Sequence, residues 1–129
     1  MKIAKILLIG MLVVSPVFCE AVEVVFSGSV DGQFDLYRAD LSTHEITRLT
    51  ETACEESMPA ASPAGDKIAF VSDRDGANSL YLMPAVGLAS EAVNVSAGMG
   101  AYANPSFSPD GSKIAAQYAP NPEVIWANT

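Results

Sequence analysis

The strongest constraint on this 129-residue chain is a phrase that it contains twice. Residues 62–69, Ser-Pro-Ala-Gly-Asp-Lys-Ile-Ala, return at 108–115 as Ser-Pro-Asp-Gly-Ser-Lys-Ile-Ala, 46 positions later. A second phrase, Phe and Ser followed by Asp-Gly and then Leu-Tyr, begins at Phe26 and again at Phe70, 44 positions later. A fixed internal period of about 40–50 residues, with short strand-like phrases between turn signals, is typical of propellers and other repeat folds.

Each copy of the repeat alternates apolar and polar residues and stops at Gly, Pro, Asn or Asp, which predicts short antiparallel strands. Pro109-Asp110-Gly111 has a physical reason to reverse the chain, because Pro fixes φ at the first turn position and Gly tolerates a positive φ. The predicted strands are 22–27, 34–38, 45–49, 58–62, 67–72, 79–83, 92–95, 104–108, 113–118 and 124–126. The sequence therefore predicts an all-β fold of β-propeller blades with four antiparallel strands each.

The repeat divides the chain into three expected units, 22–57, 58–103 and 104–129. They make an incomplete propeller of about two to three blades, whereas a closed ring needs at least about four. Open blades leave unpaired strand edges in water, which favours association. We therefore expect either that the chain is the N-terminal portion of a longer protein or that copies of it self-associate through these open blade edges.

The first 21 residues have the pattern of a secretory signal peptide. Lys2 and Lys5 precede an apolar run at 6–14, and residues 15–21 resemble a cleavage region. We expect this segment, 1–21, to be a helix that is removed after Cys19 or Ala21. The run is too short to span a bilayer, so no membrane span is expected in the mature chain.

A lipid anchor on Cys19 is the competing interpretation of this segment, but it is disfavoured because the bulky Phe18 precedes the thiol. The prediction is a secreted or periplasmic protein. If Cys19 leaves with the leader, Cys54 is the single remaining cysteine and no intramolecular disulfide can form.

Removing the leader makes the chain more acidic. The full chain has seven basic and fifteen acidic residues, for a net charge of −8. Without Lys2 and Lys5 the net charge is −9 or −10, depending on whether Glu20 stays. Binding to nucleic acid depends on Lys and Arg that displace counterions, so nucleic acid is excluded as an expected partner.

The repeat resembles the TolB-like β-propeller family, including the propeller blades of prolyl-oligopeptidase-type enzymes. Residues 105–111, Pro-Ser-Phe-Ser-Pro-Asp-Gly, and 67–76, Lys-Ile-Ala-Phe-Val-Ser-Asp-Arg-Asp-Gly, match its motifs, and Ser-Leu-Tyr-Leu-Met follows at 79–83. One departure is Ala64, which stands where the third unit has Asp110. The resemblance implies a non-catalytic secreted or periplasmic module for protein–protein interaction, with a Tol-Pal-type role in the cell envelope.

Candidate chemistry is sparse. Asp73-x-Asp75-Gly76 begins like a calcium loop, but Ala77 and Pro84 stand where oxygen ligands would be needed. His44 has no second His or Cys around which a metal or nucleophile site could form, and Glu55-Glu56 is interpreted as a solvated loop. Nucleophile-elbow and nucleotide-binding motifs are absent from the sequence. We predict no cofactor, no metal and no enzymatic activity.

Two other functions stay open from the sequence: the propeller fragment of a prolyl-oligopeptidase-type serine peptidase, and a glycan-binding or lyase propeller. For the favoured interaction module, loops that project from a rigid sheet are the expected binding surface for envelope proteins. Arg74 is expected to balance the two acids beside it. The predicted partner-binding loop residues are Asp31, Gly32, Asp73, Arg74, Asp75, Gly76 and Asn78.

Overall fold

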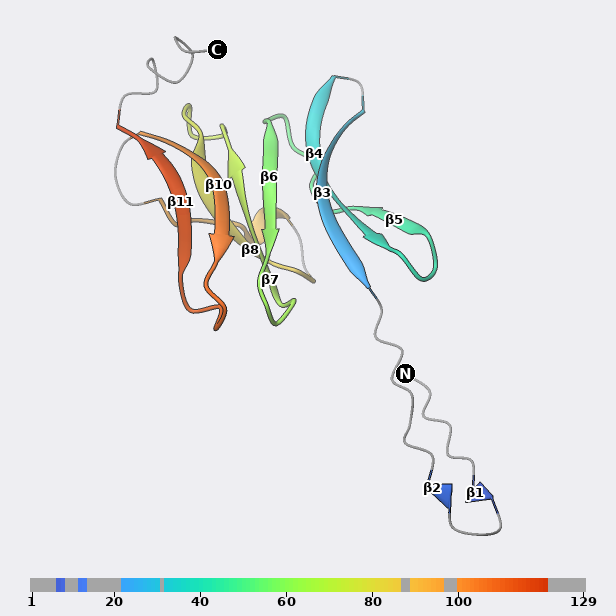
Figure 1. The fold of residues 1–129 in the computed structure, drawn as a ribbon. Coiled ribbons are helices and arrows are strands. Elements are labelled where there is room, and N and C mark those ends of the chain that lie inside the picture. The colour runs from blue at the N-terminus through green and yellow to red at the C-terminus, as the bar shows by residue number, and fades with distance from the viewer. Residues whose placement is uncertain are drawn as a thin grey trace.

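Three antiparallel sheets make up the fold in the computed structural model, which describes residues 22–30, 32–86, 89–96 and 100–120 and the backbone of 7–8 and 12–13 (Figure 1). The strands of the sheets are β3 (Glu23–Val30), β4 (Gln33–Asp40), β5 (Glu45–Arg48), β6 (Glu56–Ala61), β7 (Lys67–Ser72), β8 (Ser79–Pro84), β9 (Val93–Asn94), β10 (Ala101–Phe107) and β11 (Ile114–Ala119). A 3₁₀ turn, η1 (Ala89–Glu91), precedes β9.

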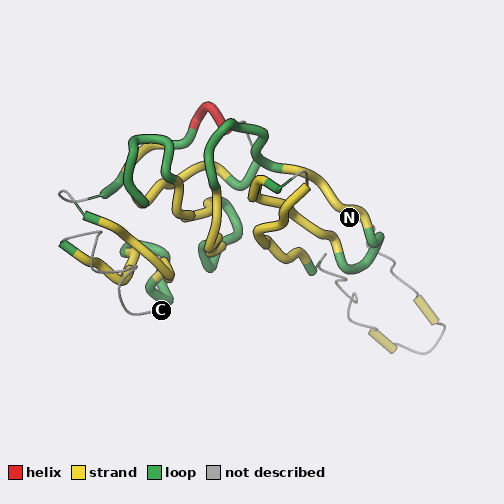
Figure 2. Tube along the Cα trace, turned by 90° about the horizontal axis from the view of Figure 1, so that it is seen from above, coloured by secondary structure: helices red, strands yellow, loops and turns green. Residues whose placement is uncertain are grey.

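The sheets have the orders β3-β4-β5, β6-β7-β8-β9 and β10-β11, and all neighbouring strands are antiparallel. Seen from above, they stand side by side in an arc (Figure 2). The middle sheet has the four strands of a complete blade. The predicted fold class, an incomplete propeller built of antiparallel blades, is confirmed; the unit boundaries at 57/58 and 103/104 stay predictions.

The expected leader helix is not what the structure shows in the described part of this segment. Leu7–Leu8 (β1) and Leu12–Val13 (β2) form a two-stranded antiparallel pair. A helix of about ten residues is marginal in water, because its nucleation is costly. The rest of the predicted signal peptide, 1–21, lies outside the described residues, as does the predicted strand 124–126. Within the described ranges, no helix has the length and apolarity to cross a membrane.

The hydrophobic core lies between the first and the middle sheet. On one face of β7 and β8, Ile68, Phe70, Tyr81 and Met83 are all at most 3% exposed. Leu36 of β4 is fully buried against them, and Val25 and Leu49 pack on the same cluster. Alternation along the strands thus gives the middle sheet an aromatic face, which the first sheet covers with aliphatic side chains.

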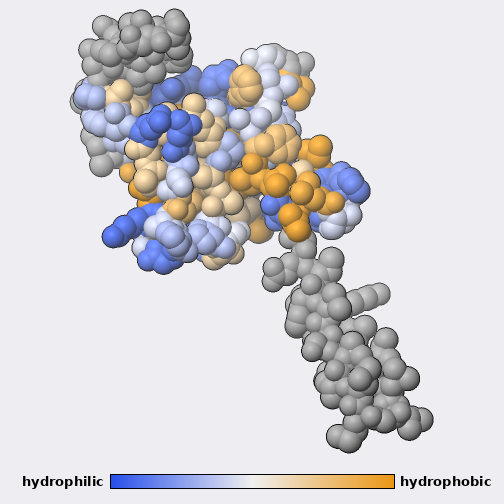
Figure 3. Space-filling view, viewed as in Figure 1, coloured by the Kyte–Doolittle hydropathy of each residue, from blue (hydrophilic) through white to orange (hydrophobic). Residues whose placement is uncertain are grey.

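The same aromatic face recurs on the first sheet, where it is uncovered. Phe26 stacks on Tyr37 with ring centroids 5.7 Å apart, as Phe70 stacks on Tyr81 at 5.7 Å. Phe26 is 37% exposed, whereas Phe70 is 0% exposed. In the space-filling view, hydrophobic side chains gather over β3–β5 (Figure 3). The repeat therefore places equivalent pairs at one covered and one open position.

The two Ser-Pro turns close in the same way. Ser62 N donates to Lys67 O at 2.9 Å, and Ser108 N donates to Lys113 O at 2.9 Å. The carboxylate that accepts a hydrogen bond from the serine hydroxyl differs between the two turns. Ser62 Oγ donates to Asp66, whereas Ser108 Oγ donates to Asp110. Asp66 takes over the acceptor role because Ala64 stands at the position of Asp110.

The inner strands share an irregularity. The pairing shifts between Ser57 and Ala60 in β6 and between Ala103 and Ser106 in β10. Met58 has φ 53° and Asn104 has φ 50°, 46 residues apart. Each precedes a Pro, which lacks the N–H for a ladder hydrogen bond and is tolerated in strands at such bulges.

The paired aromatic positions predict unequal costs of truncation. Phe70→Ala removes a ring from a fully covered site and should lower the free energy of unfolding by about 3–5 kcal/mol. Phe26→Ala, at the equivalent open site, should cost less than about half of that, because water already reaches the ring. Urea denaturation of both variants measures this difference. Equal losses would contradict the assignment of Phe26 to an uncovered face.

The Asp110 turn predicts a pH dependence of stability. Hydrogen bonds from Ser108 and Ser112 lower the pKa of Asp110 from its usual 3.8 to about 2. Because the folded pKa is depressed, this carboxylate stabilises the fold above pH 3.8, and that contribution is lost as the pH falls through 2. Asp110→Asn should therefore be less stable than the wild type at pH 6, and the gap should narrow between pH 4 and 2. Urea midpoints across this range test it; a gap independent of pH would refute it.

Candidate functional site

The β7–β8 loop, residues 73–78, contains most of the predicted binding residues. Its turn is closed by Gly76 N, which donates to Asp73 O at 2.8 Å. Gly76 has φ 86°, a backbone conformation that residues with a side chain rarely adopt. This conformation explains why Gly follows Asp75 in the turn. Asp73, Asp75 and Gly76 are exposed, and Asn78 is half-buried.

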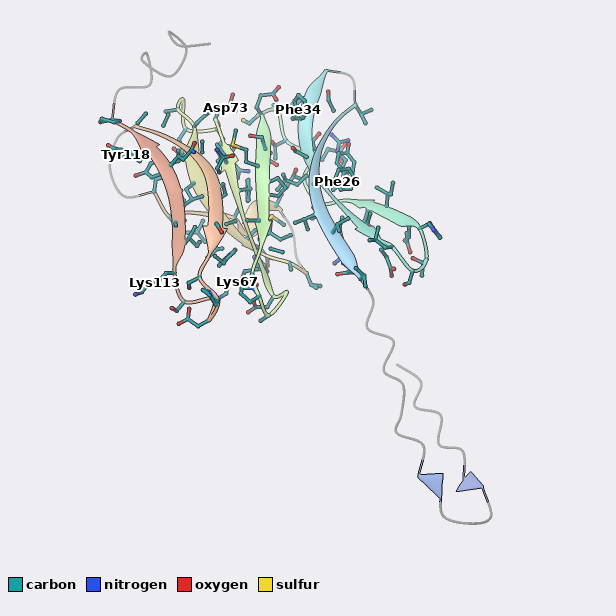
Figure 4. The ribbon with its side chains drawn as sticks, viewed as in Figure 1. Phe26, Phe34, Lys67, Asp73, Lys113 and Tyr118 are labelled. Carbon is teal, nitrogen blue, oxygen red and sulfur yellow. The ribbon has the colours of Figure 1, made fainter. Side chains whose placement is uncertain are left out.

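Hydrogen bonds tie this loop to the connection between β5 and β6. Glu55 N donates to Asp73 Oδ1 at 2.9 Å, and Phe34 N donates to Glu55 Oε2 at 3.3 Å. Gln33 Nε2 donates to the carbonyls of Thr52 and Cys54 at 2.6 and 2.8 Å. Asp73 and Phe34 lie at one end of the sheets, and Lys67 and Lys113 lie at the other (Figure 4). The hydrogen bond from Glu55 N to Asp73 Oδ1 therefore holds the β7–β8 loop against the β5–β6 connection.

Arg74 has a different role from the one that the sequence suggests. Its guanidinium pairs with Glu56, which is fully buried, and its Nε donates to Ser72 Oγ at 3.1 Å. The guanidinium carbon lies 4.5 Å from the ring centroid of Tyr81. The expectation that Glu56 is a solvated loop residue was wrong, whereas the charge of Arg74 also helps to lower the pKa of its sequence neighbour Asp75. A buried carboxylate needs a partner, and Arg74 is the cation that reaches it.

Asp75 is held by side chains from β8 and β9 of the middle sheet. It accepts hydrogen bonds from Tyr81 Oη and from Asn94 Nδ2, the latter at 2.8 Å. These bonds, Tyr81 first, lower the pKa of Asp75. Burial, together with the bond to Asp75, raises the pKa of Tyr81 to about 12. Asp75 therefore stays charged near neutral pH in a fixed orientation.

The remaining predicted residues are dispersed. Asn78 O accepts a hydrogen bond from Tyr102 N at 2.7 Å, so this residue connects the loop to β10. Gly32 is exposed in the β3–β4 turn with φ 89°. Asp31 lies outside the described residues. The structure thus groups Asp73 with Glu55, a residue that sequence reasoning did not place in the site, and their role in binding stays a prediction.

A second buried ion pair was also not predicted from the sequence. Asp35 of β4 is fully buried, and its Oδ2 accepts a hydrogen bond from Arg48 NH2 at 2.5 Å. Asp35 Oδ1 and Glu56 Oε2 find no hydrogen-bond partner among the described residues. Asp35 lies on the face of the first sheet that carries Tyr37 and Arg48, opposite to Leu36, and the alternation of the strand does not indicate that it is buried. Each buried carboxylate pairs with one arginine, and Glu56 Oε1 also accepts a hydrogen bond from Thr52 Oγ1 at 3.1 Å.

The arrangement at this end of the sheets can bind by charge. We call Glu55, Asp73 and Asp75 the acidic cluster; all three are exposed. In the ranges that the structure describes, no three His, Cys, Asp or Glu side chains gather as a metal would require. His44 is exposed, with φ 61° in the β4–β5 turn. The acidic cluster therefore presents fixed carboxylates at this end of the sheets.

The Arg74–Glu56 pair makes a prediction about stability. Arg74→Ala leaves a buried carboxylate without its cation and should lower the free energy of unfolding by about 3–5 kcal/mol. Arg38→Ala is the matched control, because Arg38 pairs with Glu23 at the surface and such pairs contribute about 0–1 kcal/mol. Urea denaturation compares the variants. A loss in Arg74→Ala no larger than that in the control would disprove the structural role of Arg74.

Comparison with known proteins agrees with this geometry. A family model described as a TolB beta propeller domain matches residues 7–126. An uncharacterized protein of Agrobacterium fabrum, Atu1656, is 31% identical over 101 residues, which are 71% of this chain and 34% of that protein.

Two solved structures are similar to about three quarters of the chain. One, assigned as TolB from Agrobacterium tumefaciens, has a TM-score of 0.72 and 26% identity, and the match covers 78% of this chain and 35% of the other. TolB from Acinetobacter baumannii has a TM-score of 0.63 and 28% identity, over 76% of this chain and 24% of that one. The chain thus spans about a third or less of the length of these relatives. From the repeat, the blades and the family match together, the chain belongs to the TolB beta propeller domain family.

Proposed function

We propose that this chain is a non-catalytic interaction module of the bacterial cell envelope, secreted or periplasmic, with a TolB-like role of the Tol-Pal type. The observation that carries the proposal is the acidic cluster at one end of TolB-family blades. There, Glu55 and Asp73 are joined by a hydrogen bond of 2.9 Å and Asp75 is fixed by Tyr81 and Asn94. Fixed side chains lose little conformational freedom when a partner binds, which favours recognition.

The charge of the chain indicates the chemistry of the partner. The chain has a net charge of −8, and the leader that we predict would remove two of its seven basic residues. Complementary charge speeds encounter and favours the correct partner. A protein that presents Lys or Arg side chains, or a polar surface with N–H donors, suits the acidic cluster.

The proposal predicts that binding weakens when charge is lost at the end of the sheets that carries the acidic cluster, but not when charge is lost at the opposite end. Asp73→Asn with Asp75→Asn removes two charges while it keeps an oxygen that can accept the bonds from Glu55 N and Tyr81 Oη. The immobilised full chain is used to capture proteins from a bacterial envelope extract, and mass spectrometry identifies them. Capture by the double variant should fall about tenfold for partners that require both carboxylates.

The matched control is Asp66→Asn with Asp110→Asn, which removes two charges from the turns at the opposite end. This control should capture the same proteins as the wild type. Equal capture by both double variants would reject the acidic cluster as the binding surface. Repeating the assay with each captured protein in purified form excludes indirect association.

A further inference from the structure

The inner strands of the middle and third sheets meet at two residues in equivalent repeat positions. Met58 of β6 and Asn104 of β10 are 46 residues apart, and each lies where the pairing of its strand shifts. Both residues have a positive φ, 53° and 50°. The two strands are in contact and run beside each other (Figure 1). Asn104 N donates a hydrogen bond to Met58 Sδ at 3.3 Å, so a methionine sulfur connects one unit to the next.

The acceptor in this hydrogen bond is a weak one. The side chain of Asn104 bonds within its own sheet, where its Nδ2 donates to Gln117 Oε1 at 2.9 Å. The link from Asn104 to the middle sheet is therefore made by its backbone N–H and the sulfur of Met58. A thioether sulfur accepts hydrogen bonds more weakly than an oxygen does. A chemical change at this sulfur can therefore strengthen the contact between the inner strands.

Met58 is open to reagents in water, whereas the other methionine of the middle sheet is not. Met58 is 42% exposed, and Met83 is 1% exposed within the hydrophobic core. Oxidation of methionine gives a sulfoxide, which turns a flexible apolar side chain into a polar one. An oxidant must reach the sulfur before it can react. The folded chain should therefore be oxidised at Met58 and protected at Met83.

We infer that Met58 is a site of oxidative modification, and that its sulfoxide holds β6 and β10 together more tightly than the thioether does. The reagent is a two-electron oxidant such as hydrogen peroxide. The sulfur attacks one peroxide oxygen, so that an S–O bond forms and the O–O bond breaks. The sulfur is oxidised by two electrons, and the peroxide is reduced to water. The new oxygen is the stronger acceptor and takes over the hydrogen bond from Asn104 N.

The surroundings of Met58 allow this exchange of acceptor. A methionine side chain has three rotatable bonds, so the sulfur can withdraw toward water by the length of one S–O bond. Because Met58 is partly exposed, the polar sulfoxide is not buried at a cost. Methionine sulfoxide reductases restore the thioether, so the change is reversible. The contact between two blades thus responds to an oxidant and can be reset.

The test treats the folded full chain with hydrogen peroxide and locates the added oxygen by mass spectrometry of its peptides. Met58 should gain oxygen, and Met83 should not. Hydrogen exchange followed by NMR then measures the backbone amide of Asn104 in the treated and untreated chains. This amide should exchange about 3- to 10-fold more slowly after oxidation, which is the effect of a hydrogen bond of ordinary strength. The amide of Phe70 in the core is the internal control and should not change.

The matched control is Met58→Leu, because leucine has a similar volume and no sulfur. In this variant, peroxide should leave the exchange of the Asn104 amide unchanged. The comparison separates Met58 from every other residue that peroxide oxidises, including the free Cys54. Methionine sulfoxide reductases should return the oxidised wild type to its original exchange rate. Oxidation of Met83 before Met58, or an Asn104 amide that exchanges at the same rate or faster once Met58 is oxidised, would overturn the inference.

Discussion

The contact between Leu36 and the aromatic face of β7 and β8 is the interaction on which the arrangement depends. Neither sheet can bury its apolar residues alone, because a two-layer core needs both faces. Leu36 has no exposed surface, and Phe70 beneath it has none. The same relation continues to the third sheet, where β10 lies against the other side of the middle sheet. Each sheet therefore serves as the cover for the next.

Of the two buried ion pairs, that of Glu56 with Arg74 fixes the loop end of the middle sheet. Glu56 begins β6 and reaches Arg74 in the β7–β8 loop, so the pair joins two segments that the chain separates by a whole hairpin. Arg74 also lies over the ring of Tyr81, which in turn donates to Asp75. Removing charged groups from water is costly, so these pairs add more to the orientation of the loop than to net stability.

The sequence predicted those parts of the fold that local chemistry determines. Ser-Pro turns, Asp-Gly turns and alternating strands have local causes, and β7, for example, has the bounds that the pattern predicts, 67–72. The pairing of Glu56 with Arg74 was missed because it depends on which residues meet in space, and adjacent acids such as Glu55 and Glu56 look alike in sequence. Within the candidate site, the loop 73–78 was located correctly as a projecting loop, but the structural use of Arg74 became visible only from its contacts.

The asymmetry between the sheets explains why repeat units of similar sequence can differ in function. In the middle sheet, the aromatic pair and the inner edge of β7 are both covered, so the strands of that sheet are scaffold and its β7–β8 loop is the part that is exposed. In the first sheet the equivalent ring of Phe26 is 37% exposed, and β3 pairs along one edge in the described part of the chain. Val30, which is exposed, stands at the repeat position that Arg74 occupies in the middle sheet. Repeat positions of similar sequence thus differ in burial according to the sheet that packs on them.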